Sequence, residues 1–227
     1  MSRRAHPAVS LLLVVPEAHV RQLDLHFQTA WYDVFHRARP NQISHVLCMG
    51  PIVWVMLVLA CLLPLPGFTP PGLDLGLVLG LALVAAYVAM DRGLGLVMAP
   101  VMAALWASAH LLIGARGAGA FPIALVVLAV AGALQTWTHS FEDVPPPLSG
   151  TEGWVTVSEW RRKTPLPRLM LAFALASSVY ILVEIVSSPR LFGVQVFKLM
   201  LRLGYKPSVR AEIAAESRRI LATSHAA

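Results

Sequence analysis

Residues 73–90 read LDLGLVLGLALVAAYVAM, and residues 94–114 read LGLVMAPVMAALWASAHLLIG. Asp74 is the only charged residue in either run, and each is about as long as the 20 apolar residues needed to cross a bilayer as a helix. In lipid the backbone polar groups must be satisfied within the segment, so these runs predict helices and exclude isolated strands. They define an α-helical membrane architecture.

Similar runs lie on either side. The first expected span covers Pro51–Leu65; it can begin as early as Gln42, with a kink at Pro51. A fourth covers Phe121–Thr138. A fifth apolar run, Leu169–Val186, leaves open whether it crosses fully. The predicted fold class is all-α, a polytopic membrane helix bundle with four or five spanning helices.

The composition of the whole chain agrees with this prediction. Of its 227 residues, 57% are hydrophobic and 13% charged, whereas a soluble domain carries about 25% charged residues. The net charge of +6 and pI near 9.9 raise the possibility of nucleic-acid binding. The basic residues, however, flank apolar runs, as they do in membrane proteins that orient by the positive-inside rule. We therefore expect a lipid bilayer, and no nucleic acid, as partner.

A single membrane-embedded domain, residues 1–227, is expected. Residues 17–50 form a helix–corner–helix unit, 51–145 the four-span core, and 146–227 an extension with the fifth apolar helix and a basic tail. Within that tail Ser208–Thr223 has helical spacing of apolar residues and predicts a surface helix.

The expected order of spans assigns four of the histidines to one side of the membrane or the other. His36 and His45 precede the first span, and His139 returns to their side of the membrane after four crossings. His110 lies near the far end of the third span and belongs to the opposite face. Three histidines can therefore meet at one membrane boundary, which we take as cytoplasmic.

The spacing of His36 and His45 requires a corner. In an unbroken helix, nine residues place two side chains on opposite faces and about 13 Å apart along the axis. Pro40 disfavours helix at Arg39, and Asn41 is a suitable cap for the helix that follows. A corner here brings the two imidazoles together.

A second polar stripe ends the fourth span. Gln135, His139 and either Glu142 or Asp143 follow at helical spacing, so they share one face. Two or three imidazoles with a carboxylate suit non-haem Fe(II), and Zn is chemically possible.

The pattern Tyr32-x3-His36-x4-Asn41-x3-His45, followed by Gly50-Pro51 and about ninety residues later by Gln135-x3-His139, resembles the 2-hydroxy fatty acid dioxygenase family. The resemblance covers roughly residues 31–148. It implies a small multi-span protein of the bacterial inner membrane or endoplasmic reticulum membrane. It also implies an Fe(II) enzyme that uses O2 to shorten a 2-hydroxy fatty acid by one carbon, with loss of CO2.

By this resemblance His36, His45 and His139 are the iron ligands. Asn41, Gln135 and Glu142 are then expected beside them as catalytic residues.

Arg37 and Arg39 are candidates to bind the substrate carboxylate, although the positive-inside rule also accounts for them as orientation charges. Cys48 and Cys61 lack a CxxC spacing and are assigned to packing. Asp74 is assigned to the membrane interface or to capping of a helix.

Two alternatives stay open. One is another membrane lipid-modifying metalloenzyme; di-iron hydroxylases and desaturases, however, need HxxxH and HxxHH clusters that this chain lacks. The other is a non-enzymatic transporter or scaffold with an ion-binding site, which should carry polar residues in the middle of its spans.

Overall fold

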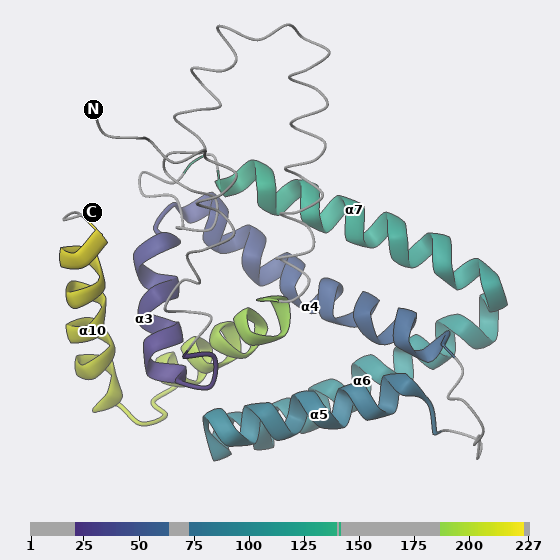
Figure 1. Cartoon of the computed structure of the whole chain (residues 1–227), viewed down its shortest axis with the longest axis horizontal. Coiled ribbons are helices and arrows are strands. Elements are labelled where there is room, and N and C mark those ends of the chain that lie inside the picture. Colours follow the sequence, from purple (N-terminus) through teal and green to yellow (C-terminus); the bar gives the residue numbers. More distant parts are fainter. Residues whose placement is uncertain (1–20, 64–72, 140, 142–186, 225–227) are drawn as a thin grey trace, which may run out of the picture.

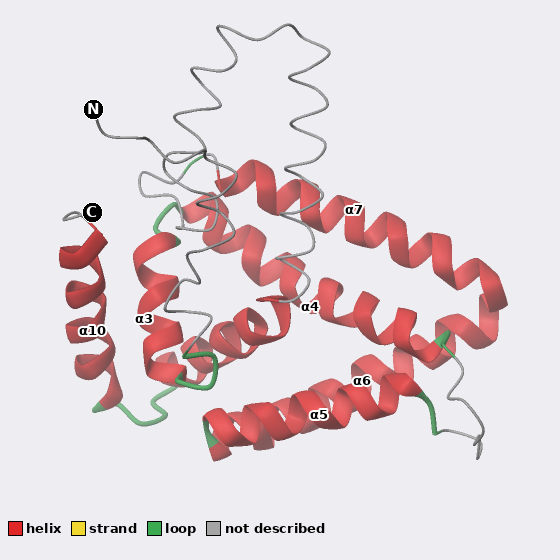
Figure 2. Cartoon of the chain, viewed as in Figure 1, coloured by secondary structure: helices red, strands yellow, loops and turns green. Residues whose placement is uncertain are grey.

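The computed structural model describes residues 21–63, 73–139, 141 and 187–224. Within these residues the protein is helical and contains no strand, which confirms the all-α prediction (Figure 2). A further helical run occupies residues 187–202. The other elements are α3 (Leu25–Phe35), α4 (Arg39–Cys61), α5 (Leu75–Met90), α6 (Arg92–Arg116), the 3₁₀ turn η1 (Gly117–Gly119), α7 (Ala120–His139) and α10 (Val209–Ser224).

Helices α4 to α7 run alternately in opposite directions and form an elongated four-helix bundle (Figure 1). Two stretches are long and apolar enough to cross a membrane. They are Arg39–Cys61, with a mean hydropathy of 2.1, and Arg92–Gln135, with a mean hydropathy of 2.2. The second comprises α6, η1 and most of α7, and it turns at Gly117, whose φ of 53° suits glycine. Helix α5 is apolar but has only 16 residues.

Two aspartates set the boundaries of α5 and α6. The Asp74 carboxylate accepts a hydrogen bond from the backbone N–H of Leu77 (2.7 Å) and so caps α5. Asp91 accepts one from the N–H of Leu94 (2.9 Å) and caps α6. An acidic N-cap satisfies a backbone donor that the helix leaves unbonded and favours the positive end of its dipole. The capping role expected for Asp74 is therefore confirmed.

The start of α4 corrects two expectations. The helix begins at Arg39 with Ala38 as N-cap, so Pro40 lies within its first turn and Asn41 is not a cap. Proline is tolerated there because a first-turn N–H has no intrahelical acceptor and the ring already holds a helical φ. The corner is consequently formed by residues 36–38. At its other end α4 stops at Cys61, four residues before the expected Leu65.

Helix α3, residues 187–202 and α10 pack together at the end of the bundle where α4 starts and α7 finishes (Figure 1). Lys198 forms an ion pair with Asp33 of α3, and Lys206 pairs with Asp91 between α5 and α6 (2.5 Å). The expected surface helix at Ser208–Thr223 is observed as α10. The fifth apolar run, Leu169–Val186, lies outside the described residues.

Two hydrophobic clusters occupy the two ends of the bundle. The larger one joins α3, the first half of α4, the α5–α6 turn and residues 187–202, with Phe27, Met49, Tyr87 and Phe197 among its buried side chains. The smaller one joins α4, α6 and α7 near Ala120, mostly through small residues. The larger cluster includes Tyr32, whose ring stacks on His36.

Candidate functional site

The imidazoles of His36 and His45 meet at the corner before α4. Their ring centroids lie 4.4 Å apart and the ring planes are nearly perpendicular, at 84°. His36 is 5% exposed and His45 is fully buried. The corner therefore brings the two side chains together, although nine residues separate them in the sequence.

Tyr32 orients His36. The two rings stack with centroids 4.2 Å apart, and His36 Nδ1 lies 3.1 Å from the Tyr32 carbonyl oxygen. A carbonyl can only accept, so Nδ1 carries the proton and donates it. In a neutral imidazole Nε2 then holds the lone pair that binds a metal, and a backbone acceptor of this kind fixes the tautomer and ring direction of metal-ligating histidines.

Hydrogen bonds between buried side chains fasten the end of α7 to the start of α4. The Thr138 hydroxyl lies 2.6 Å from Ser44 Oγ, and it shares its one proton between Asn41 Oδ1 (3.2 Å) and, within α7, the Gln135 carbonyl oxygen (3.0 Å). All three residues are buried. His139, the last residue of α7, directly follows Thr138, so its backbone reaches the same end of the bundle as His36. The His139 side chain, and Glu142 and Asp143, lie outside the described residues.

Gln135 is fully buried one turn before Thr138. Among the described residues, neither its Oε1 nor its Nε2 has a hydrogen-bond partner. Because α7 runs antiparallel to α4 and Thr138 contacts Asn41 and Ser44, this turn of α7 packs along the first half of α4 (Figure 1). A buried amide without partners costs roughly 2 kcal/mol or more, so we expect Gln135 to have a polar partner beyond the described residues.

A groove of about 510 Å³ lies between the first half of α4 and residues 187–202. Its α4 wall includes Ile43, Val46 and Leu47, each at least half exposed. Tyr32, which stacks on His36, also lines it. The groove thus joins an apolar surface to the aromatic ring beside the histidine pair.

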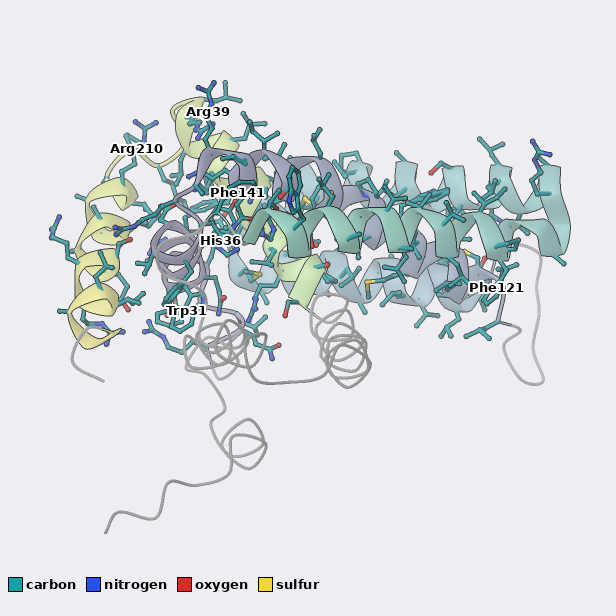
Figure 3. All side chains as sticks on the ribbon, turned by 90° about the horizontal axis from the view of Figure 1, so that it is seen from above. Trp31, His36, Arg39, Phe121, Phe141 and Arg210 are labelled. Atoms are coloured by element: carbon teal, nitrogen blue, oxygen red, sulfur yellow. The ribbon has the colours of Figure 1, made fainter. Side chains whose placement is uncertain are left out.

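Positive charge gathers at the same end of the bundle. Arg39 and Arg202 line the groove, are exposed and form no ion pair within the described part of the chain. Arg37, the other arginine predicted to bind substrate, is exposed at the corner and does not line it. Figure 3 shows His36, Arg39 and Phe141 at one end of the molecule and Phe121 at the other.

His110 lies at the opposite end, as the topology predicted. Its Nε2 lies 2.6 Å from Asp74 Oδ2, while Asp74 Oδ1 accepts from Trp106 Nε1 (3.3 Å) and from Cys61 Sγ (3.6 Å). Burial raises the pKa of Asp74, but the hydrogen bonds from Leu77 N–H, Trp106 and His110 outweigh it, and the pKa lies below its usual value. Cys61 is therefore part of a polar cluster, beyond the packing role assigned to it.

Sequence reasoning missed this cluster because its residues come from three helices with no motif in common. It also missed the groove, since residues 187–202 show no pattern that pairs them with α4. Thr138 was a weak indication of a site residue, because it is a polar residue next to His139 in an apolar run. Comparisons with known proteins add nothing further: no family model, no curated protein and no solved structure matches the chain.

Proposed function

We propose that this protein is a membrane-embedded Fe(II)-dependent dioxygenase that converts a 2-hydroxy fatty acid and O2 to a fatty acid one carbon shorter, CO2 and water. The observation that carries the proposal is the buried, perpendicular pair of His36 and His45. Gln135, whose amide lacks a partner among the described residues, lies near the same end of the bundle, one turn before Thr138. The motif resemblance supplies the reaction class.

The donor set fits iron. His36, His45 and His139 would hold Fe(II), with neutral imidazole nitrogens of the kind that suit non-haem iron. The hydrogen bond from His36 Nδ1 to the Tyr32 carbonyl leaves Nε2 as the ligand atom. A hydrogen bond from a ligand at the metal would satisfy the buried amide of Gln135.

The exposed surface supports a location in the bilayer. Only 22% of an apolar 18-residue stretch within Arg92–Gln135 is buried within the protein, whereas the core helix of a soluble protein is mostly buried. Large apolar side chains face outward, among them Leu96, Leu111 and Val126, each more than 60% exposed. An apolar surface this extensive needs lipid around it.

In this proposal α4, α5, α6 and α7 are the four spans. α4, α6 and α7 are about 30 Å long or longer, which matches the hydrocarbon core of a bilayer. α5 is about 24 Å long and requires local thinning of the bilayer or the adjoining residues to complete the crossing.

The charges orient the protein. Arg37, Arg39, Lys198 and Lys206 lie at the end that carries His36, whereas Arg116 lies at the end of α6 on the other side. By the positive-inside rule, this charge distribution supports a cytoplasmic location for the histidine site.

The groove is the proposed binding site for the 2-hydroxy fatty acid. The acyl chain lies along Ile43, Val46 and Leu47, while its carboxylate pairs with Arg39 and Arg202, since guanidinium binds carboxylate in a bidentate fork. This arrangement delivers the hydroxyl and carboxylate carbons toward Tyr32 and the histidines.

When bound, Fe(II) supplies the redox chemistry with O2 that an amino-acid side chain cannot provide. The chain supplies position and a dry environment: Tyr32 covers one face of His36, and the core cluster excludes water from His45. Asn41, held by Thr138, keeps α4 and α7 in register around the site.

The test is metal analysis of the full chain purified in detergent, followed by O2 uptake with a panel of 2-hydroxy fatty acids. We expect about one iron per chain and O2 consumption with products one carbon shorter. His36→Ala and His45→Ala should each lose iron and activity.

His26→Ala is the matched control, because His26 is partly exposed on α3 and pairs with Glu212 of α10. It should keep both iron and activity. Helical content and gel-filtration profile must match wild type in every variant. Full iron occupancy in both His36→Ala and His45→Ala rejects the site. Iron binding without O2 uptake on any 2-hydroxy acid rejects the reaction and favours an ion-binding membrane protein.

A further inference from the structure

A second group of metal-ligating side chains gathers at the end of the bundle far from His36. Cys61 ends α4, Asp74 caps α5, and His110 projects from the second half of α6. One ligand atom from each lies within 4.8 Å of the other two. Cys61 is sixteen residues, or about 24 Å of helix, beyond His45, so this group is separate from the proposed iron site.

The spacing of these atoms is close to that around a tetrahedral ion. Zinc bonds of about 2.0–2.3 Å place neighbouring ligand atoms roughly 3.3–3.8 Å apart. Cys61 Sγ lies 3.6 Å from Asp74 Oδ1, and His110 Nε2 lies 2.6 Å from Asp74 Oδ2, so the thiol and the imidazole approach different oxygens of one carboxylate. Shifts of less than about 1.5 Å would bring one atom of each side chain to tetrahedral spacing.

The surroundings hold the carboxylate in place. Leu77 N–H and Trp106 Nε1 both donate to Asp74 Oδ1, which fixes the side chain between the three helices. Gly76 allows the close approach of α4, because a Cβ at this position would clash with Cys61 Sγ and lie 3.2 Å from the Leu57 carbonyl oxygen. Side chains that orient ligands in this way are typical of metal sites.

We propose that Cys61, Asp74 and His110 bind Zn²⁺ and clamp together the ends of α4, α5 and α6. The three ligands supply sulfur, oxygen and nitrogen, a combination that zinc accepts, and the partly exposed His110 leaves a fourth position open to water. On binding, the Cys61 thiol releases its proton to solvent and binds as thiolate, and the His110 ring proton resides on Nδ1 so that Nε2 binds the metal.

Cobalt(II) reports this site directly. Titrating the detergent-purified full chain with Co²⁺ should produce the thiolate-to-cobalt charge-transfer band with a stoichiometry of one, and added Zn²⁺ should remove it. The chain has two cysteines, so replacing each in turn shows which one supplies the thiolate. Cys61→Ser and His110→Ala should lose the band, whereas Cys48→Ser, which alters the cysteine near His45, should keep it.

Stability gives a second readout. In protein already loaded with Fe(II), the unfolding equilibrium constant of wild type and of Cys48→Ser should fall about 100-fold at free Zn²⁺ a hundredfold above its Kd, with no change in Cys61→Ser. His36→Ala should still bind Zn²⁺ here, which keeps this result independent of the iron site. Absence of a thiolate band in wild type, or a band that survives in Cys61→Ser, overturns the proposal.

Discussion

Thr138 is expected to hold the end of α7, which carries His139, against the start of α4, which carries His45. It is 3% exposed, its hydroxyl contacts Ser44 Oγ at 2.6 Å, and it donates to Asn41 Oδ1 at 3.2 Å. Thr138→Val keeps the branched shape but removes the donor and leaves buried acceptors on α4 short of one hydrogen bond. One lost bond and one desolvated acceptor together cost about 2 kcal/mol. This corresponds to roughly a 30-fold change in the unfolding equilibrium constant.

The assay is thermal unfolding in detergent, where Tm should fall by about 4–8 °C for a chain of this length. Because His139 is the next residue, iron affinity should fall as well. Thr29→Val is the matched control: Thr29 is equally buried, but its hydroxyl donates only to Leu25 O within α3 (2.7 Å), so the loss should stay below about 1 kcal/mol. Equal losses in the two variants would refute the argument that the Thr138 contact joins α4 and α7.

Two more predictions concern the end of the bundle that carries His36. Asp91→Ala should lower the free energy of unfolding, measured by chemical denaturation, by about 2–3 kcal/mol. The substitution removes the cap of α6 and the acceptor for Tyr205 (2.9 Å) and Lys206. Burial raises the pKa of Asp91, but hydrogen bonds, led by that from Lys206, lower it overall, so its stabilisation is complete above about pH 4 and is lost as pH falls through the lowered pKa. An unchanged acid-unfolding curve in the variant contradicts this. Gly193→Ala should lower the free energy of unfolding by about 1–3 kcal/mol, because the new Cβ would lie 2.6 Å from Tyr87 Cε1. A variant as stable as wild type would show that residues 187–202 and α5 can move apart at little cost.

Much of the fold could be predicted because its signals are local. The apolar runs predicted α5, α6 and α7 to within two residues at each end, and Asp74 was assigned to the interface or to capping. That Asp91 caps α6 came only from the structure. The start of α4 was misplaced because Pro40 was taken as a break, although a proline in the first turn costs the helix nothing.

The candidate site was only partly predictable. The spacing of His36 and His45 required a corner, and the corner brings their rings to 4.4 Å. Nothing in the spacing linked Thr138 to Asn41, since that contact depends on the register of two helices almost a hundred residues apart. Register follows from the packing of many side chains at once, which one sequence does not reveal.

Residue types and their periodicity, available from the sequence alone, predicted the helices of the described residues, their apolar character and the meeting of His36 and His45. Tertiary structure decided which polar groups share a site. It brought Lys198 to Asp33 and lined the groove beside Tyr32 with residues 187–202; it also gathered Cys61, Asp74 and His110 from three helices. Hydrogen bonding within a helix depends on neighbours a few residues away, whereas the meeting of distant side chains depends on how whole helices pack.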